Sequence, residues 1–231
     1  MAKLLLVRHG QASYGQLDYD KLSPKGEQQA RQLGPYLAAQ KPAAVFVGPL
    51  VRQQQTASIA RQAAPSLPEP ITLDGLAEYP GFDLVKAFLP KLVEEDPELA
   101  MMATAPTREL ADRAFKTILT RWSRDEWKID GVERVAEFTA RVEAALSKAA
   151  ASCGSGGTIC AVTSAGPIGV AVGLVFGATA HHMVRASSTI RNASVSELKL
   201  RTHEFAWHPD KVSMVTFNST AHLSADLVTE Y

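Results

Sequence analysis

The chain has 231 residues, of which 46% are hydrophobic, and its 24 basic side chains balance 24 acidic ones. This composition is typical of a globular protein and excludes the disordered and fibrous classes. Without net charge, no overall field draws the chain to nucleic acid or to a membrane. An anionic ligand must therefore be bound by a local cluster of cations.

Cysteine usage and hydropathy indicate a cytoplasmic protein. The two cysteines, Cys153 and Cys160, fit no zinc or redox spacing and are expected to be reduced thiols. The longest uncharged stretch, 167–180, has about fourteen residues, whereas a bilayer span needs about twenty. We expect no targeting segment and no membrane or nucleic-acid partner, and the sequence gives no basis for an oligomeric state.

The first third of the chain alternates between short apolar runs and amphipathic segments. Residues 3–7 predict a strand buried on both faces, and Ser23-Pro24 begins a helix with an N-cap hydroxyl and a proline in the first turn. A second strand at 43–47, a helix at 51–64 and a weak third strand at 71–73 are expected to follow. This order is typical of a parallel α/β sheet.

The middle of the chain is predicted to be helical. Residues 82 to about 150 carry the i, i+3, i+4 apolar pattern with no convincing strand between them. We interpret about 82–130 as a helical insertion over one end of the sheet, followed by a helix that returns to it. Trp122 and Trp127 are expected in its core.

The last third returns to strands. A buried strand at 158–163 leads through a glycine-bearing turn into a helix at 167–176, and His181-His182 are expected in a polar turn after it. Alternating segments at 194–200, 204–208 and 212–217 predict two or three antiparallel strands. The sequence therefore predicts one α/β domain over 1–231: a three-layer α/β/α fold with a mostly parallel mixed sheet and an antiparallel C-terminal edge.

The strongest chemical signal is Arg8-His9-Gly10, directly after the first strand. Ligands of open α/β sheets bind beyond the carboxyl ends of the strands, so this triplet lies where a site is expected. Arginine offers a planar fork of donors that matches phosphate oxygens, and histidine can be a nucleophile at neutral pH. Glycine allows the backbone to approach a ligand closely.

The segments LLLVRHGQASYG and DYDKLSPKGEQQA resemble the opening of the histidine phosphatase superfamily. The similarity is to the branch that contains cofactor-dependent phosphoglycerate mutases and broad-specificity phosphatases. Further similar segments follow in order, but none lies in the helices at 82–150. They are GPLVR with QTA at 48–57, LAE at 76–78, VTSAG at 162–166 and NSTAHL at 218–223.

The resemblance implies a role for each matching residue. His9 would attack phosphorus and become phosphohistidine, while Arg8 and Arg52 would hold the phosphoryl oxygens. Glu78 would protonate the leaving oxygen and then take a proton from water, with Asp83 as the alternative acid. Ser164 and Ala165 would line the substrate site. The implied substrate is a small phosphorylated molecule, with no cofactor and no metal.

Two positions depart from the family pattern. The family normally has a second histidine where this chain has Ser164, and a hydroxyl donates one hydrogen bond without a charge. The branch often has an asparagine where this chain has Gly15, and Gln16 is the candidate to replace it. Both changes reduce the number of side chains that can bind the phosphate. They argue against a phosphoglycerate mutase and leave a phosphatase, a slow phosphatase or an inactive phosphate-binding homologue.

An α/β-type serine hydrolase is a weaker alternative. Ser164 lies at a strand-to-helix turn, and Asp210 and His222 follow in the order of such a triad. However, a nucleophile elbow needs glycine two residues before the serine, where this chain has Val162. That hypothesis also leaves Arg8-His9-Gly10 without a role.

Overall fold

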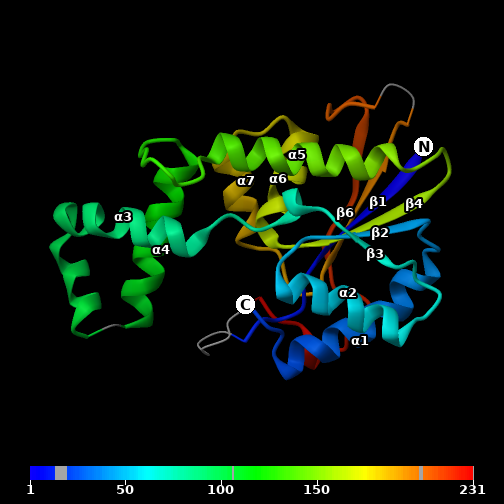
Figure 1. Cartoon of the computed structure of the whole chain (residues 1–231), viewed down its shortest axis with the longest axis horizontal. Coiled ribbons are helices and arrows are strands. Elements are labelled where there is room, and N and C mark those ends of the chain that lie inside the picture. Colours follow the sequence, from blue (N-terminus) through cyan, green and yellow to red (C-terminus); the bar gives the residue numbers. More distant parts are fainter. Residues whose placement is uncertain (14–19, 106, 203–204, 231) are drawn as a thin grey trace.

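The computed structural model describes residues 1–13, 20–105, 107–202 and 205–230. Its centre is a six-stranded sheet with the strand order β3-β2-β4-β1-β5-β6 (Figure 1). The strands are β1 (Ala2–Arg8), β2 (Ala44–Val47), β3 (Pro70–Thr72), β4 (Thr158–Thr163), β5 (Val195–Leu200) and β6 (Val212–Ser219). The first four strands run parallel and β5 and β6 are antiparallel to their neighbours, as the sequence predicted.

Helices cover both faces of this sheet (Figure 1), which confirms the predicted α/β class with its antiparallel C-terminal edge. Helices α1 and α2 lie on one face, and α5, α6 and α7 lie on the other. The helices are α1 (Pro24–Ala39), α2 (Val51–Ala63), α3 (Gly81–Glu95), α4 (Arg108–Ser123), α5 (Val135–Ala151), α6 (Ala165–Phe176) and α7 (Ala180–Ser187). Short 3-10 helices occupy Asp74–Leu76, Pro97–Ala103 and Ala225–Leu227.

Strand β1 is buried on both faces because its side chains alternate between two cores. Leu5 and Val7 pack with α1 and α2, whereas Leu4 and Leu6 pack in the larger core on the opposite face. This explains why residues 3–7 form a continuous apolar run instead of an alternating one. The two cores fix β1 and thereby the residue that follows it, His9.

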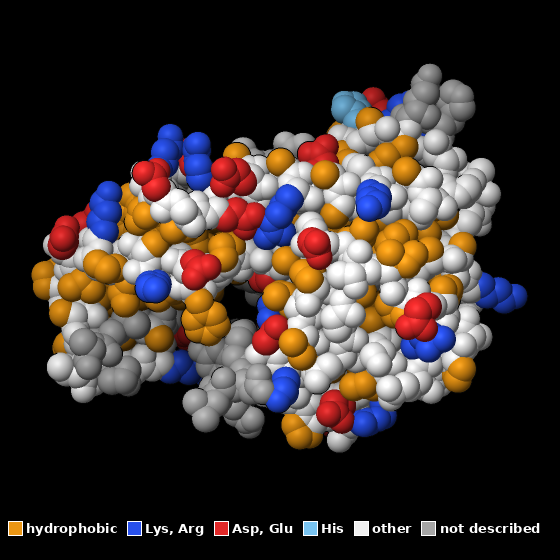
Figure 2. All heavy atoms as spheres, viewed as in Figure 1, with side chains coloured by type: hydrophobic (Ala, Val, Ile, Leu, Met, Phe, Trp, Pro, Cys, Tyr) orange, Lys and Arg blue, Asp and Glu red, His pale blue; other side chains and the backbone are white. Residues whose placement is uncertain are grey.

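The helical insertion extends away from the sheet (Figure 1), where α3 and α4 pack against each other. Trp122 and Trp127 are buried in the larger core, as predicted, and Trp127 stacks on Phe88 with ring centroids 5.3 Å apart. Figure 2 shows the surface hollowed between this insertion and the part of the molecule that holds the sheet.

Two local predictions were wrong. His181 and His182 lie in α7 and not in a turn: Gly177 ends α6 in the left-handed conformation, and a new helix begins three residues later. Residues 205–208 do not form a strand, because this segment leaves the sheet. The Trp207 indole N–H donates to Ser147 Oγ on α5 at 3.0 Å. The antiparallel edge therefore consists of β5 and β6.

Within the part of the chain that the structure describes, no helix combines the length and the apolar character needed to cross a bilayer.

Candidate active site

The His9 backbone is fixed between β4 and the segment that precedes β5. Its N–H donates to the Thr163 carbonyl at 2.9 Å, and its own carbonyl accepts from the Ala193 N–H at 3.0 Å. The residue is 5% exposed. His9 thus lies at the carboxyl ends of the parallel strands, where the sequence predicted the site.

Hydrogen bonds at both ring nitrogens define the state of His9. The Arg52 Nε–H donates to His9 Nε2 at 3.0 Å, and His9 Nδ1 lies 2.7 Å from the Gly10 carbonyl oxygen. Because a guanidinium can only donate, Nε2 must carry the lone pair and Nδ1 the proton. Burial, followed by the charges of Arg52 and Arg8, holds the pKa of His9 well below its usual value. The imidazole is therefore neutral, with its lone pair on Nε2.

Arg52 is buried at the first turn of α2 and is held from two sides. Its Nη1 pairs with the Asp20 carboxylate at 2.5 Å, while its Nε faces His9. The other Asp20 oxygen accepts the Val51 N–H at 2.9 Å, so this carboxylate also lies at the positive end of the helix. Sequence reasoning assigned Arg52 to the site but missed Asp20, although Asp20 belongs to the family-like segment DYDKLSPKG.

The Arg8 guanidinium is anchored to the C-terminal part of the chain. Its Nη1 donates to the Ile190 carbonyl and to the Glu230 carbonyl, the latter at 3.2 Å. Arg8 is nevertheless close enough to lower the pKa of His9 by its charge. The structure therefore brings Arg8 to the neighbourhood of His9, with backbone carbonyls as its hydrogen-bond partners.

The Glu78 carboxylate is bound by two backbone amides. Its Oε2 accepts the Gly166 N–H at 3.0 Å, and its Oε1 accepts the Tyr79 N–H at 3.1 Å. Burial raises the pKa of Glu78, although the Gly166 amide and the Arg52 charge oppose this shift. The carboxylate is thus held at the start of α6 in a form that gains a proton more readily than an exposed glutamate.

Glycines at two positions permit close approaches around the site. A Cβ on Gly166 would lie 1.9 Å from Glu78 Oε1, so only glycine leaves room for the carboxylate. A Cβ on Gly10 would lie 2.5 Å from the Gly26 carbonyl oxygen at the start of α1. Gly10 is therefore needed where two backbones meet, which is a different reason from the approach of a ligand.

The Glu78 segment is supported by Arg141, which sequence reasoning missed. The Arg141 guanidinium on α5 donates to the carbonyls of Gly75, Ala77 and Glu78 at 2.8–3.1 Å and pairs with the Glu133 carboxylate. One arginine on an amphipathic helix gives no signal that distinguishes it from a solvated residue. Only the fold shows that it orders the loop that carries Glu78.

Ser164 and Ala165 lie at the junction of β4 and α6, next to His9 in the sheet. Ser164 is fully buried, and its Oγ accepts the Gln53 Nε2–H at 2.7 Å. Ala165 begins α6, one residue before the amide that binds Glu78. Gln16, the remaining predicted substrate contact, and Gly15 lie outside the described residues.

The serine hydrolase alternative is not supported by the geometry. Asp210 is paired with His208 at 3.3 Å, and the His222 ring stacks on Tyr36 with centroids 4.8 Å apart. Among the described residues, Ser164 is hydrogen-bonded to Gln53 and to neither of the other two triad candidates.

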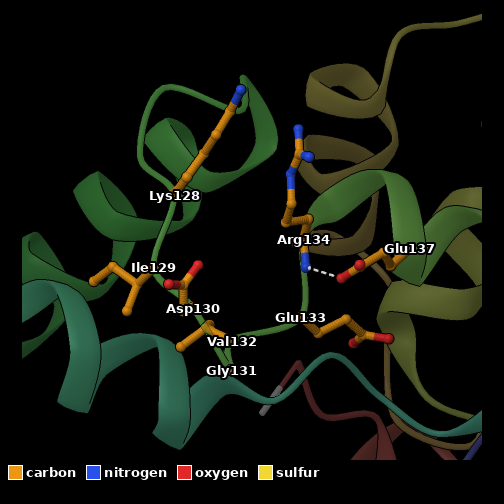
Figure 3. A pocket seen from close by; sticks show the side chains of 8 residues that line it. All are labelled: Lys128, Ile129, Asp130, Gly131, Val132, Glu133, Arg134 and Glu137. Carbon is orange, nitrogen blue, oxygen red and sulfur yellow. Dashed lines mark hydrogen bonds between the residues drawn. The ribbon is translucent and has the colours of Figure 1, made fainter.

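A separate cavity of about 410 Å³ lies at the connection between α4 and α5 (Figure 3). Charged side chains of both signs surround it, and the Arg134 backbone N–H donates to Glu137 at 2.8 Å on its rim. It contains none of the predicted site residues. The lining residues are Lys128, Ile129, Asp130, Gly131, Val132, Glu133, Arg134 and Glu137.

Comparison with protein families identifies the class of this site. The model of the histidine phosphatase superfamily (branch 1) matches residues 4–98 and 98–210. The chain therefore belongs to the histidine phosphatase superfamily, as the sequence motifs predicted. No curated protein sequence matches the chain.

Solved structures share the fold along nearly the whole chain. YhfR of Bacillus stearothermophilus is 18% identical, with a TM-score of 0.65 over 96% of this chain and 99% of its own. A mycobacterial glucosyl-3-phosphoglycerate phosphatase in complex with inorganic phosphate is 19% identical, with a TM-score of 0.66 over 96% and 99%. A mutant phosphoserine phosphatase from Entamoeba histolytica, bound to phosphoserine, is 18% identical with a TM-score of 0.62 over 97% and 100%.

Proposed function

We propose that this protein is a phosphomonoester hydrolase that transfers the phosphoryl group of a small phosphorylated molecule to Nε2 of His9. The observation that carries the proposal is the presence of a neutral, buried His9 together with a buried carboxyl group, Glu78, whose pKa is raised; the charges of Arg52 and Arg8 act on both. A nucleophile must be unprotonated and a general acid protonated, and the two environments favour these states. Superfamily membership supports the same reaction.

In the first step, Nε2 of His9 attacks phosphorus while the bond between phosphorus and the ester oxygen breaks. The Glu78 carboxyl group gives its proton to the departing oxygen, and Arg52 and Arg8 balance the charge of the phosphoryl oxygens. In the second step, water attacks the phosphohistidine, Glu78 takes a proton from that water, and the bond between nitrogen and phosphorus breaks. The products are an alcohol, inorganic phosphate and free enzyme.

Binding of the substrate requires Arg52 to change partners. Its Nε occupies the Nε2 lone pair of His9, which must be released before attack on phosphorus. The phosphoryl oxygens are stronger acceptors for a guanidinium than a neutral imidazole is. We infer that a bound phosphoryl group draws the Arg52 donors to its own oxygens and so exposes the nucleophile.

Quenching the reaction during turnover tests the intermediate. With 32P-labelled aryl phosphate, the wild-type chain is expected to carry a base-stable, acid-labile phosphoryl group on His9. The His9→Ala variant should carry none and release essentially no phosphate, because covalent catalysis then has no substitute. His208→Ala, which changes an exposed histidine, is the matched control and should behave as wild type. Phosphate release by His9→Ala at the wild-type rate would refute the proposal.

A catalytically weak or inactive phosphate-binding homologue is the second candidate. The observation that favours it is Ser164, a neutral side chain where the family normally has a histidine. Such a protein would bind phosphate or vanadate at His9, Arg8 and Arg52 without turnover. A panel of phosphate esters, together with anion binding measured by calorimetry, separates the two candidates.

A further inference from the structure

Gln53 is a fully buried polar side chain in the first turn of α2, and neither motif nor family resemblance assigned it a role. Both N–H groups and the oxygen of its side-chain amide make hydrogen bonds. Its Nε2 donates to the Leu76 carbonyl at 3.1 Å and to Ser164 Oγ at 2.7 Å, and its Oε1 accepts the Leu50 N–H at 3.1 Å.

These partners determine which way the amide points. The Leu50 N–H can only donate and the Leu76 carbonyl can only accept, so the oxygen must face Leu50 and the nitrogen must face Leu76. A flipped amide would place its NH2 group against the Leu50 N–H and its oxygen against the Leu76 carbonyl, and neither pair can form a hydrogen bond. Gln53 therefore presents an N–H to Ser164, and the serine oxygen is the acceptor in this hydrogen bond.

The Ser164 hydroxyl also does not cap the helix that it precedes. It is the N-cap residue of α6, where a hydroxyl normally accepts an amide N–H of the first turn, but its side chain makes no such bond. The Gly166 N–H is bound by Glu78 instead. Because a hydroxyl has one proton, and Gln53 supplies a proton to its oxygen, the Ser164 proton must be directed elsewhere.

Ser164 lies next to His9, the residue proposed to accept the phosphoryl group. Ser164 follows β4 directly, and the residue before it, Thr163, accepts the backbone N–H of His9 at 2.9 Å. Neighbouring strands lie about 4.8 Å apart, so Ser164 and His9 are side by side at the same edge of the sheet. Among the described residues, no hydrogen bond donated by the Ser164 hydroxyl is found.

We propose that Gln53 is a positioning residue that fixes the Ser164 hydroxyl as a one-proton donor to the phosphoryl group on its way to His9. This inference rests on the proposed function and deepens it. It means that the chain holds the phosphoryl group with the charges of two arginines and one oriented neutral donor. The matched pair of Gln53 and Ser164 thus serves where the family normally has a second histidine.

A double-mutant cycle tests whether Gln53 acts through Ser164. Ser164→Ala should lower kcat about 10- to 150-fold, the range that corresponds to one hydrogen bond to a charged group, with little change in KM. Gln53→Met should lower kcat in the wild-type background but much less in the Ser164→Ala background. Losses that simply multiply in the double variant would overturn the proposal.

We expect Gln53→Met to fold, although the Leu50 N–H, on a half-buried residue, loses its acceptor. The Leu76 carbonyl keeps the Thr163 hydroxyl as a donor at 2.6 Å, so it is not left unsatisfied. Should this variant prove unstable, Gln53→Ala removes the same donor without introducing a buried charge and gives the same cycle. Thermal unfolding midpoints of all variants separate a loss of folded protein from a loss of kcat.

Gln54→Met is the matched control. Gln54 is the next glutamine of α2, and its amide donates to the Gly48 carbonyl and to Thr72 Oγ, away from Ser164. It should leave kcat unchanged and show no coupling to Ser164→Ala. If phosphohistidine forms on His9 but Gln53 and Ser164 are uncoupled, only this inference fails. If no phosphohistidine forms, the proposed function fails.

Discussion

At the scale of single residues, His9 and Glu78 have pKa shifts in opposite directions. An ordinary histidine has a higher pKa than an ordinary glutamate, so few molecules would hold a neutral imidazole and a protonated carboxyl group together. Burial lowers the pKa of His9 and raises that of Glu78, which increases the population of this combination. Burial of both side chains therefore favours the two protonation states that the proposed reaction needs.

Replacement of the acid should depend on the leaving group. Glu78→Gln is expected to slow hydrolysis of alkyl phosphates about 100-fold or more, within the range typical of general acid catalysis. Hydrolysis of p-nitrophenyl phosphate should change far less, because nitrophenolate departs with little protonation. Steady-state kinetics on both substrates measures the difference. Asp83→Asn, on the exposed start of α3, is the control, and equal losses on both substrates for Glu78→Gln would remove Glu78 from this role.

The pH dependence of kcat/KM should follow the same two groups. His9 must be neutral, and its pKa lies well below 6.5, so activity should persist as the pH falls below that value. Glu78 must be protonated, and its pKa is raised above 4.5, so activity on an alkyl phosphate should fall as the pH rises through that higher value. Comparing wild type with Glu78→Gln on the same ester cancels the titration of the substrate. Only the wild type should show the alkaline decline, and a decline that persists in the variant would contradict the assignment.

At the scale of elements, α6 and β4 bring together groups that lie far apart in the sequence. The first turn of α6 binds the Glu78 carboxylate, and the end of β4 places Ser164 beside His9. An amide at a helix start favours a negative charge, yet in the proposed reaction this carboxyl group also takes up a proton. The absence of a side chain at Gly166 allows Glu78 to approach the start of α6 closely.

Gly166→Ala should therefore have an effect similar to that of replacing the proposed general acid, Glu78. The added Cβ would lie 1.9 Å from Glu78 Oε1, which forces the carboxylate away from the helix start. We expect a loss of kcat that is larger on alkyl phosphates than on p-nitrophenyl phosphate, as for Glu78→Gln. Gly154→Ala is the control, because a Cβ there meets nothing within 4 Å. Unchanged kinetics in Gly166→Ala would show that the position of the carboxylate is not critical.

The elements that the sequence predicted are those whose local chemistry is strong. The continuous apolar run of β1 and the Ser23-Pro24 start of α1 predicted the bounds of both elements to within a few residues. Burial and capping are local effects, so a short segment of sequence carries the signal. Helix α7 was missed because it has only eight residues and two histidines in its first turn. It packs against α6 and α4, contacts that a sequence does not show directly.

The sequence offers site candidates where residues carry motifs, and it offers none where residues act through others. His9, Arg52 and Glu78 belong to short segments with a chemical reason for each residue type. Asp20 and Arg141 act by holding Arg52 and the Glu78 loop, and an ion pair or a bond to a carbonyl leaves no periodic trace in a sequence. Such supporting contacts depend on distances across the fold.

At the scale of the whole molecule, 24 basic side chains balance 24 acidic ones, so the chain has no net charge. We therefore expect the attraction of a phosphate ester to depend on a local pair of charges, Arg8 and Arg52, which act on His9. Within the described residues, no group of three or more His, Cys, Asp and Glu side chains is arranged to hold a metal ion. We expect the two arginines to balance the charge of the phosphoryl oxygens during transfer.

This distribution of charge leads to the prediction that hydrolysis needs no divalent metal. Dialysis against a chelator such as EDTA should leave kcat and KM on an aryl phosphate unchanged, and added Mg²⁺ or Zn²⁺ should not raise them. Arg52→Gln, which removes one of the two charges, should lower kcat/KM about 100-fold or more, because an oriented charge-assisted bond to the transition state is lost. Arg61→Gln, on the exposed end of the same helix, should not. Activity that disappears with the chelator and returns with a divalent ion would mean that a metal supplies the charge assigned here to the arginines.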